Sequence, residues 1–160
     1  MLNVKHFRDL IIVPTLKMVG LESPSATVLL LGTAIQESTL THLTQLDGDD
    51  DPYDDAVGLY QMEVKTHDDI WENYLNYRPQ LADAVQGLTA FPPTAREMVG
   101  NLWYATAMCR VHYRRVPEAL PDPGDIEGMA DYWKAHYNTF EGAGTGEEFI
   151  ENWNEATFGM

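Results

Sequence analysis

The chain has 160 residues, of which 44% are hydrophobic and 11% aromatic, so we expect one domain of residues 1–160 whose core needs no covalent crosslinks. Its 10 basic and 25 acidic residues give a net charge of −15, which argues against nucleic acid or an anionic membrane surface as a partner. The single cysteine excludes an intrachain disulfide.

No secretion signal is recognisable near the N-terminus. The apolar residues 10–13 are followed by Pro14 and lack a small-residue cleavage site, and the apolar run 28–31 is too short to span a bilayer. We therefore expect the chain to fold in a cytoplasm. If it acts outside, something other than a signal peptide delivers it.

In chain order, the first predicted helix covers residues 3–20, with a kink or restart expected at Pro14. A second helix is predicted from Ser23 to about residue 43, because Ser23 is a suitable N-cap and Pro24 suits the first helical position. Its stretch 28–35 is almost entirely apolar, so we expect this helix to lie inside the core.

Residues 47–55 form an acidic, turn-rich loop in which Asp47, Asp49 and Asp51 alternate as at the start of a calcium loop. The sixth position is proline where an EF-hand needs glycine, and the twelfth is Gly58 where it needs glutamate. We therefore predict a solvated loop near a substrate cleft, with no metal site and no cofactor. Calcium binding remains the alternative.

The remaining periodic segments are predicted to be helical, at residues 63–77, 79–87, 94–115, 125–137 and from 145 onward. Capping-box patterns begin two of them, Thr94 with Glu97 and Thr145 with Glu148. The one candidate for strands is a short β-hairpin near residues 54–62. The sequence therefore predicts a mainly α fold.

Glu37 is the candidate with the clearest chemical rationale. It follows the apolar stretch 28–35, where buried and exposed surfaces are expected to meet. Desolvation raises the pKa of a carboxyl group, and a glutamate that stays protonated near neutral pH can donate a proton to a leaving glycosidic oxygen. The competing interpretation is a helix-end glutamate that points into water and has no chemical role.

Three separated segments bear on this choice: Gln36-Glu37-Ser38, Gly58-Leu59-Tyr60-Gln61-Met62, and Tyr137-Asn138-Thr139-Phe140-Glu141-Gly142. Together they resemble the soluble lytic transglycosylase family and its relatives in the lysozyme-like superfamily, including goose-type lysozymes. That family carries Glu-Ser at the end of a buried helix, then Gly-Leu-Met-Gln or similar, then an Ala-Tyr-Asn-x-Gly-like element. The resemblance spans residues 30–142 and implies a lysozyme-like helical fold.

The resemblance implies a role for each matching residue. Glu37 is implied to be the single catalytic acid and then base, and Tyr137 to pack over it and orient it. Gly58 is implied to let backbone approach a sugar, and the amides of Gln61 and Asn138 to be paired, because an unpaired buried amide is costly. The full set of implied substrate-binding residues is Ser38, Gly58, Tyr60, Gln61, Tyr137 and Asn138.

The third segment departs from the family pattern, because His136 and Thr139 flank its Tyr-Asn pair and its glycine comes late, at Gly142. Among nearby aromatic residues, Trp103 and Trp133 either line a sugar cleft or belong to the core. Cys109 is predicted to be a small core residue rather than a nucleophile, and His112 one turn later does not alter that.

The implied activity is cleavage of the MurNAc–GlcNAc β-1,4 bond in the glycan strands of peptidoglycan. Lytic transglycosylases manage with one carboxylate, because the N-acetyl group assists and the 6-hydroxyl attacks to leave a 1,6-anhydro end. Asp54 or Asp55 in the acidic loop keeps lysozyme-type hydrolysis open as a variant.

Acidity, small size and the missing signal favour a phage enzyme that opens the wall. We expect it in the virion, in the tail or inside, or in the host cytoplasm before release to the periplasm. Other virion proteins are then candidate partners, and nucleic acid and membranes are not. The alternative is a structural tail or capsid protein of lysozyme-like fold with weak or lost activity.

Overall fold

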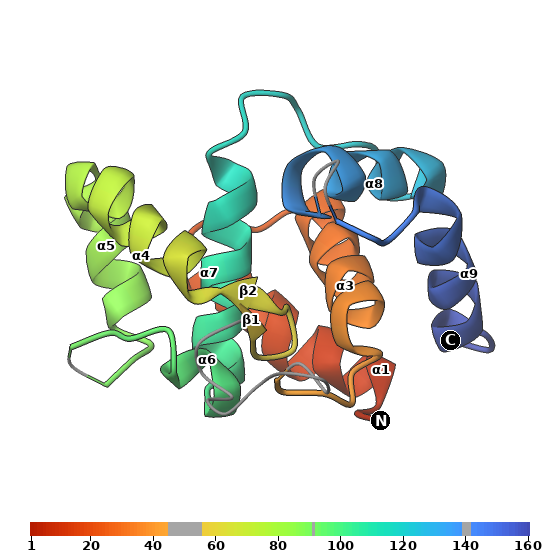
Figure 1. Ribbon diagram of the computed structural model, residues 1–160, viewed down its shortest axis with the longest axis horizontal. Helices are drawn as coiled ribbons and strands as arrows, with labels where there is room; N and C mark the ends of the chain where they lie inside the picture. The colour runs from red at the N-terminus through yellow and green to blue at the C-terminus, as the bar shows by residue number, and fades with distance from the viewer. Residues whose placement is uncertain (45–55, 91, 139–141) are drawn as a thin grey trace.

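The computed structural model describes residues 1–44, 56–90, 92–138 and 142–160, and it confirms a mainly helical fold (Figure 1). The acidic loop 47–55, with its calcium and hydrolysis alternatives, lies outside the described residues, as do residues 139–141 of the third segment. Within the described ranges no helix is both long and apolar enough to cross a membrane.

The chain begins with consecutive helical segments, α1 (Val4–His6), the π-helical η1 (Phe7–Ile12) and α2 (Val13–Met18). The wider π-type hydrogen bonding falls just before Pro14, which has no N–H to donate. The restart expected at that proline is therefore confirmed as a change of helix type.

Helix α3 (Pro24–Ser38) begins where the sequence predicts. The Ser23 hydroxyl accepts a 3.0 Å hydrogen bond from the Ala26 N–H, and Pro24 occupies the first turn. The helix ends at Ser38 rather than near residue 43, because Thr39 and Leu40 both have left-handed backbone, with φ of 48° and 54°. Glu37 is thus in the last turn of a helix that is buried along most of its length.

The predicted hairpin is confirmed as an antiparallel pair of two-residue strands, β1 (Ala56–Val57) and β2 (Met62–Glu63). The turn between them is held by Gly58 at φ +75°, whose N–H also donates to the Leu43 carbonyl at 2.8 Å. A Cβ on Gly58 would stand 2.5 Å from the Met98 carbonyl oxygen, so only glycine fits there without a shift.

The other helical elements follow in the order α4 (Val64–Asn73), the 3-10 helix η2 (Leu75–Tyr77), α5 (Pro79–Gln86), α6 (Glu97–Gly100), α7 (Leu102–Arg114), α8 (Ile126–Trp133), the π-helical η3 (Lys134–Asn138) and α9 (Gly146–Thr157). The capping box of Thr145 with Glu148 is confirmed. The one expected at Thr94 is wrong, because Glu97 instead accepts from the Ala90 N–H and the Asn101 amide, and Asn101 caps α7.

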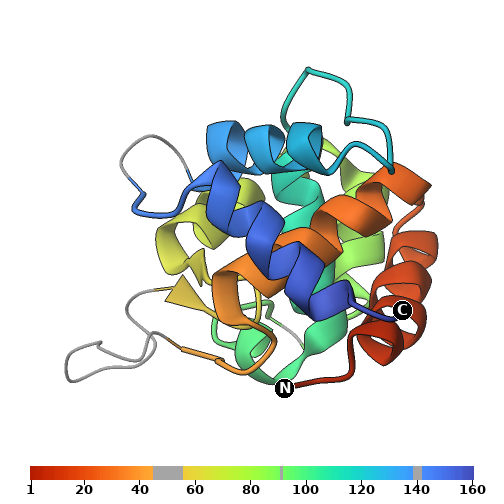
Figure 2. The same cartoon turned by 90° about the vertical axis from the view of Figure 1, so that its right-hand side faces the viewer.

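Helices α7 and α3 run through the middle of the molecule, with α4 and α5 beside α7 and α8 lying across one end (Figure 1). Helix α9 crosses the face of α3 (Figure 2), and the two pack so closely that a Cβ on Gly32 would stand 2.4 Å from a Phe149 ring carbon. Cys109 is fully buried in this core, as predicted. The hairpin and η3 meet beside the C-terminal end of α3, where the Tyr137 hydroxyl donates to the Tyr60 carbonyl.

Candidate active site

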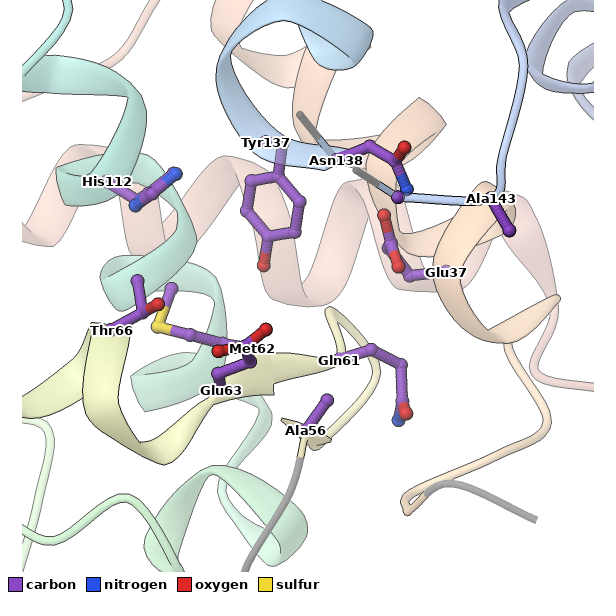
Figure 3. Close-up of a pocket in the computed structure, with 11 residues that line it drawn as sticks. Glu37, Ala56, Gln61, Met62, Glu63, Thr66, His112, Tyr137, Asn138 and Ala143 are labelled. Atoms are coloured by element: carbon purple, nitrogen blue, oxygen red, sulfur yellow. The ribbon is translucent and has the colours of Figure 1, made fainter. Parts of the chain in front are cut away.

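A pocket of about 300 Å³ opens where the end of α3 meets the hairpin, α7 and η3 (Figure 3). All three segments singled out in the sequence contribute to it. Its described lining residues are Glu37, Ala56, Gln61, Met62, Glu63, Thr66, His112, Tyr137, Asn138, Gly142 and Ala143. Figure 3 shows Tyr137 and Asn138 beside Glu37, with Gln61 on the hairpin below them and its amide group directed away from Glu37.

Glu37 is half-buried, and its carboxylate accepts a 2.8 Å hydrogen bond from the indole N–H of Trp133. Burial raises the pKa of Glu37 to about 7, and the Trp133 hydrogen bond opposes this shift because it favours the charged form. Near neutral pH the carboxyl group therefore exists in comparable amounts as acid and as carboxylate. That is the state a proton donor and acceptor needs.

Trp133 donates a hydrogen bond to Glu37, in addition to the packing by Tyr137 that the family resemblance implies. The Trp133 side chain is only 1% exposed, and its ring lies 5.5 Å from that of Phe149. The indole is therefore held rigidly with its N–H aimed at Glu37. Trp133 is therefore a core residue rather than an exposed wall of a sugar cleft. Trp103 is exposed, and it is not among the described residues that line the pocket.

Tyr137 forms a wall of the pocket rather than a hydrogen bond to Glu37. Its hydroxyl donates to the backbone carbonyl of Tyr60 at 2.7 Å, which ties η3 to the hairpin. Its ring lies 5.0 Å from His112 and 5.3 Å from Tyr113. Burial raises the pKa of Tyr137, so the hydroxyl stays protonated and available for this bond.

The two amides expected in the site both line the pocket, and each has a partner of its own. The Gln61 amide N–H donates to the Gly58 carbonyl at 2.7 Å. The Asn138 carbonyl oxygen accepts from the Lys134 ammonium at 2.7 Å, and Lys134 also donates to the Gly142 carbonyl. Each amide thus uses one polar atom locally and has a second that can face a ligand.

The described lining residues do not include Ser38, Gly58 or Tyr60, for which substrate contact was expected. Ser38 is 2% exposed, and its hydroxyl donates to the Ala34 carbonyl and accepts from the Leu40 N–H. Tyr60 is 1% exposed, with its hydroxyl 3.1 Å from that of Thr106. These three residues lie behind the pocket's described lining, at the helix end and the turn, and substrate contact by them stays a prediction.

His112 lines the pocket, although sequence reasoning gave it no role there. Its Nε2 donates to the His136 carbonyl at 2.9 Å, and its Nδ1 accepts from the Arg115 guanidinium at 3.0 Å. Burial lowers the pKa of His112 to about 4, so the imidazole is neutral and holds η3 in place. The sequence signal that could have indicated this position is spacing, because His112 lies one helical turn after Cys109 on the core side of the predicted helix.

Glu63 is a second carboxylate on the rim, also missed by sequence reasoning. It is exposed and forms an ion pair with Lys65 at 2.7 Å. The available signal was its place directly after the predicted hairpin, two residues from Gln61. Asp54 and Asp55, the second carboxylates that the sequence suggests, lie outside the described residues.

Among the residues that the structure describes, no group of three or more His, Cys, Asp or Glu side chains could hold a metal ion. The chain matches no protein-family model, and comparisons with curated proteins and with solved structures return no match. Any functional assignment therefore depends on the geometry of the pocket and on the sequence resemblance.

Proposed function

We propose that the protein cleaves the β-1,4 bond between MurNAc and GlcNAc in peptidoglycan, as a lysozyme-like enzyme of the lytic transglycosylase type. The observation that supports this most is Glu37, a carboxyl group with a pKa of about 7 at a pocket shared with Gln61, Tyr137 and Asn138. Those residues come from the three segments on which the resemblance depends.

In the proposed reaction, Glu37 as the acid donates its proton to the glycosidic oxygen as the bond from C1 to that oxygen breaks. The N-acetyl carbonyl oxygen of the MurNAc residue attacks C1 and carries the positive charge that develops. The carboxylate left on Glu37 is stabilised by the Trp133 N–H. Glu37 then takes the proton from the sugar's 6-hydroxyl as the 6-oxygen bonds to C1. The bond from C1 to the N-acetyl oxygen breaks in the same step, which restores the neutral N-acetyl group and gives the 1,6-anhydro end.

Hydrolysis is the variant of this reaction that Glu63 favours. In that variant a water molecule replaces the 6-hydroxyl, and a second carboxylate at the pocket holds it. Glu63 lies at the pocket and is exposed, so it is placed for such a role if its ion pair with Lys65 opens. Products of hydrolysis are heavier than anhydro products by one water.

The biological setting remains a proposal based on the resemblance and on composition. A phage virion or lysis protein that opens the host wall fits a chain of 160 residues with a net charge of −15. Its partners would be glycan strands and other virion proteins.

The direct test compares wild type with Glu37→Gln in a zymogram containing purified peptidoglycan. Glutamine keeps the acceptor for the Trp133 N–H but cannot donate a proton, so we expect clearing by wild type and none by Glu37→Gln. Glu22→Gln, which removes an exposed glutamate, is the matched control and should clear like wild type. Equal clearing by Glu37→Gln would remove Glu37 from the mechanism.

A structural tail or capsid protein is the second candidate. The departure of the third segment from the family pattern favours it, because Lys134 occupies the Asn138 carbonyl and the Gly142 carbonyl. Absence of clearing by well-folded wild-type protein would support this candidate.

A further inference from the structure

A second hollow, of about 290 Å³, is lined in part by Leu21, Tyr74, Arg78, Gln80 and Arg114. Helix α7 contributes Arg114 to this hollow and His112 to the catalytic pocket. Residues two positions apart lie about 200° apart around a helix axis, so the two openings are on different sides of α7. The hollow is therefore separate from the proposed glycan site.

Tyr74 connects the two exposed arginines of the hollow. The Arg78 guanidinium lies 3.6 Å from the centre of the Tyr74 ring, and one of its N–H groups donates to the Tyr74 carbonyl at 3.2 Å. The Tyr74 hydroxyl donates to the Arg114 carbonyl at 3.4 Å. The Arg78 side chain is thus fixed on a ring that also contacts the Arg114 backbone.

Arg110 is a third arginine, and it contacts the wall of the hollow through Leu21. Its side chain is only 8% exposed, and its Nε donates at 3.3 Å to the carbonyl of Leu21, which lines the hollow. It lies one helical turn before Arg114, a spacing at which like charges repel each other. Burial, and then the charge of Arg114, lower the pKa of Arg110.

Within the described part of the chain, none of these three arginines forms an ion pair, whereas Arg8, Lys65, His67 and Arg115 each do. The chain has 25 acidic residues for 10 basic ones, so carboxylates are plentiful. Arg78 and Arg114 nevertheless line the hollow, and Arg110 contacts its Leu21 wall, without such a partner. A buried cation without a counter-charge costs free energy, and a bound anion would relieve both that cost and the mutual repulsion.

We propose that this hollow is a binding site for an oxyanion, a phosphate or carboxylate group of a small ligand. Guanidinium groups match both anions through paired N–H donors, and the Gln80 amide can add a further donor. This proposal does not depend on the proposed catalytic activity.

The test follows thermal unfolding and titration calorimetry at pH 7 with sodium phosphate and with succinate, against sodium chloride at equal ionic strength. We expect a saturable rise of Tm with at least one of the two anions. The double variant Arg78→Gln/Arg114→Gln should bind that anion at least tenfold more weakly. Arg8→Gln, which removes an arginine paired with Asp9 elsewhere, is the matched control and should bind like wild type.

Binding of phosphate alone, of succinate alone or of both supports the site and identifies the group it takes. Absence of saturable binding, or equal binding by wild type and the double variant, overturns the proposal. Both substituted side chains are exposed, so we expect the variant to fold. If it does not, Arg114→Lys, which keeps the charge but loses the paired donors, should still weaken binding. Glu37→Gln should bind the anion like wild type, which separates this test from that of catalysis.

Discussion

At the scale of single residues, the site depends on how two neighbours set the protonation of Glu37. Burial favours the neutral carboxyl group, and the Trp133 N–H favours the carboxylate. The balance leaves the pKa of Glu37 at about 7, far above the 4.5 of a free glutamate. The Trp133 N–H is the hydrogen-bond donor to this carboxyl group, so a substitution of Trp133 should change both the pKa and the orientation of Glu37.

The pH dependence of stability follows from this shift. The folded-state pKa of Glu37 is raised, so the folded state holds the proton more tightly, and its advantage is present below pH 4.5 and lost as pH rises towards 7. Relative to Glu37→Gln, wild type should lose about 3 kcal/mol of unfolding free energy between pH 4 and pH 8. Urea unfolding of both proteins at the two pH values measures this. A constant difference would mean that Glu37 is solvated.

Replacement of Trp133 by phenylalanine removes the donor and should raise the pKa of Glu37 further, since the hydrogen bond lowers it. Carboxyl carbon NMR shifts report the pKa directly. Stability should fall by about 1–3 kcal/mol from the volume lost in the core. The control Trp103→Phe alters a side chain that is 45% exposed and should change neither quantity. An unchanged or lowered pKa in Trp133→Phe would contradict the assigned contact.

At the scale of elements, the hairpin turn carries Gln61 to the pocket, and Gly58 makes that turn possible. Gly58 combines a φ of +75° with a close approach to the Met98 backbone. Gly20 has a similar φ of +69° but open space around its Cβ position. Alanine substitutions at the two glycines therefore distinguish the destabilisation caused by backbone conformation from that caused by steric crowding.

We expect Gly20→Ala to cost about 1 kcal/mol, from conformation alone, and Gly58→Ala to cost about 2–4 kcal/mol, because the Met98 carbonyl must also move. Chemical denaturation of both variants measures the difference. Gly58→Ala should also reduce any wall-clearing activity, since the turn positions Gln61. Equal destabilisation by the two substitutions would show that the turn can move away from α6 without cost.

The starts of elements were more predictable from sequence than the site contacts. Ser23 and Pro24 mark the start of α3 through bonds within one turn, and Thr145 does the same for α9, so local patterns sufficed. The end of α3 depends on the left-handed backbone of Thr39 and Leu40. Neither residue is a glycine, so no local sequence signal marks this helix end. The contact of Trp133 with Glu37 joins residues 96 positions apart, so only the packing of α8 on α3 reveals it.

At the scale of the whole molecule, the charge of −15 is the dominant feature. Like charges repel one another in the compact state, and salt screens them over about 8 Å at physiological ionic strength.

We therefore expect the Tm to rise by several degrees between about 10 mM and 500 mM sodium chloride, from screening of this repulsion. Scanning calorimetry measures it, with sucrose at equal osmolality as the uncharged control. A falling Tm would mean that ion pairs outweigh the repulsion. Calcium chloride should do no more than sodium chloride of equal ionic strength, and a distinct calcium shift would instead support a cation site in the acidic loop.

The central claim is that Glu37 breaks a glycosidic bond, and mass spectrometry of purified peptidoglycan digested with wild type and with Glu37→Gln tests it most directly. We predict muropeptides with 1,6-anhydro ends from wild type, 18 Da lighter than hydrolytic products because they lack one water, and no release by Glu37→Gln. Hydrolytic masses would keep Glu37 but transfer the second step to water held by Glu63. Equal release by both proteins, or none by wild type, would contradict the account.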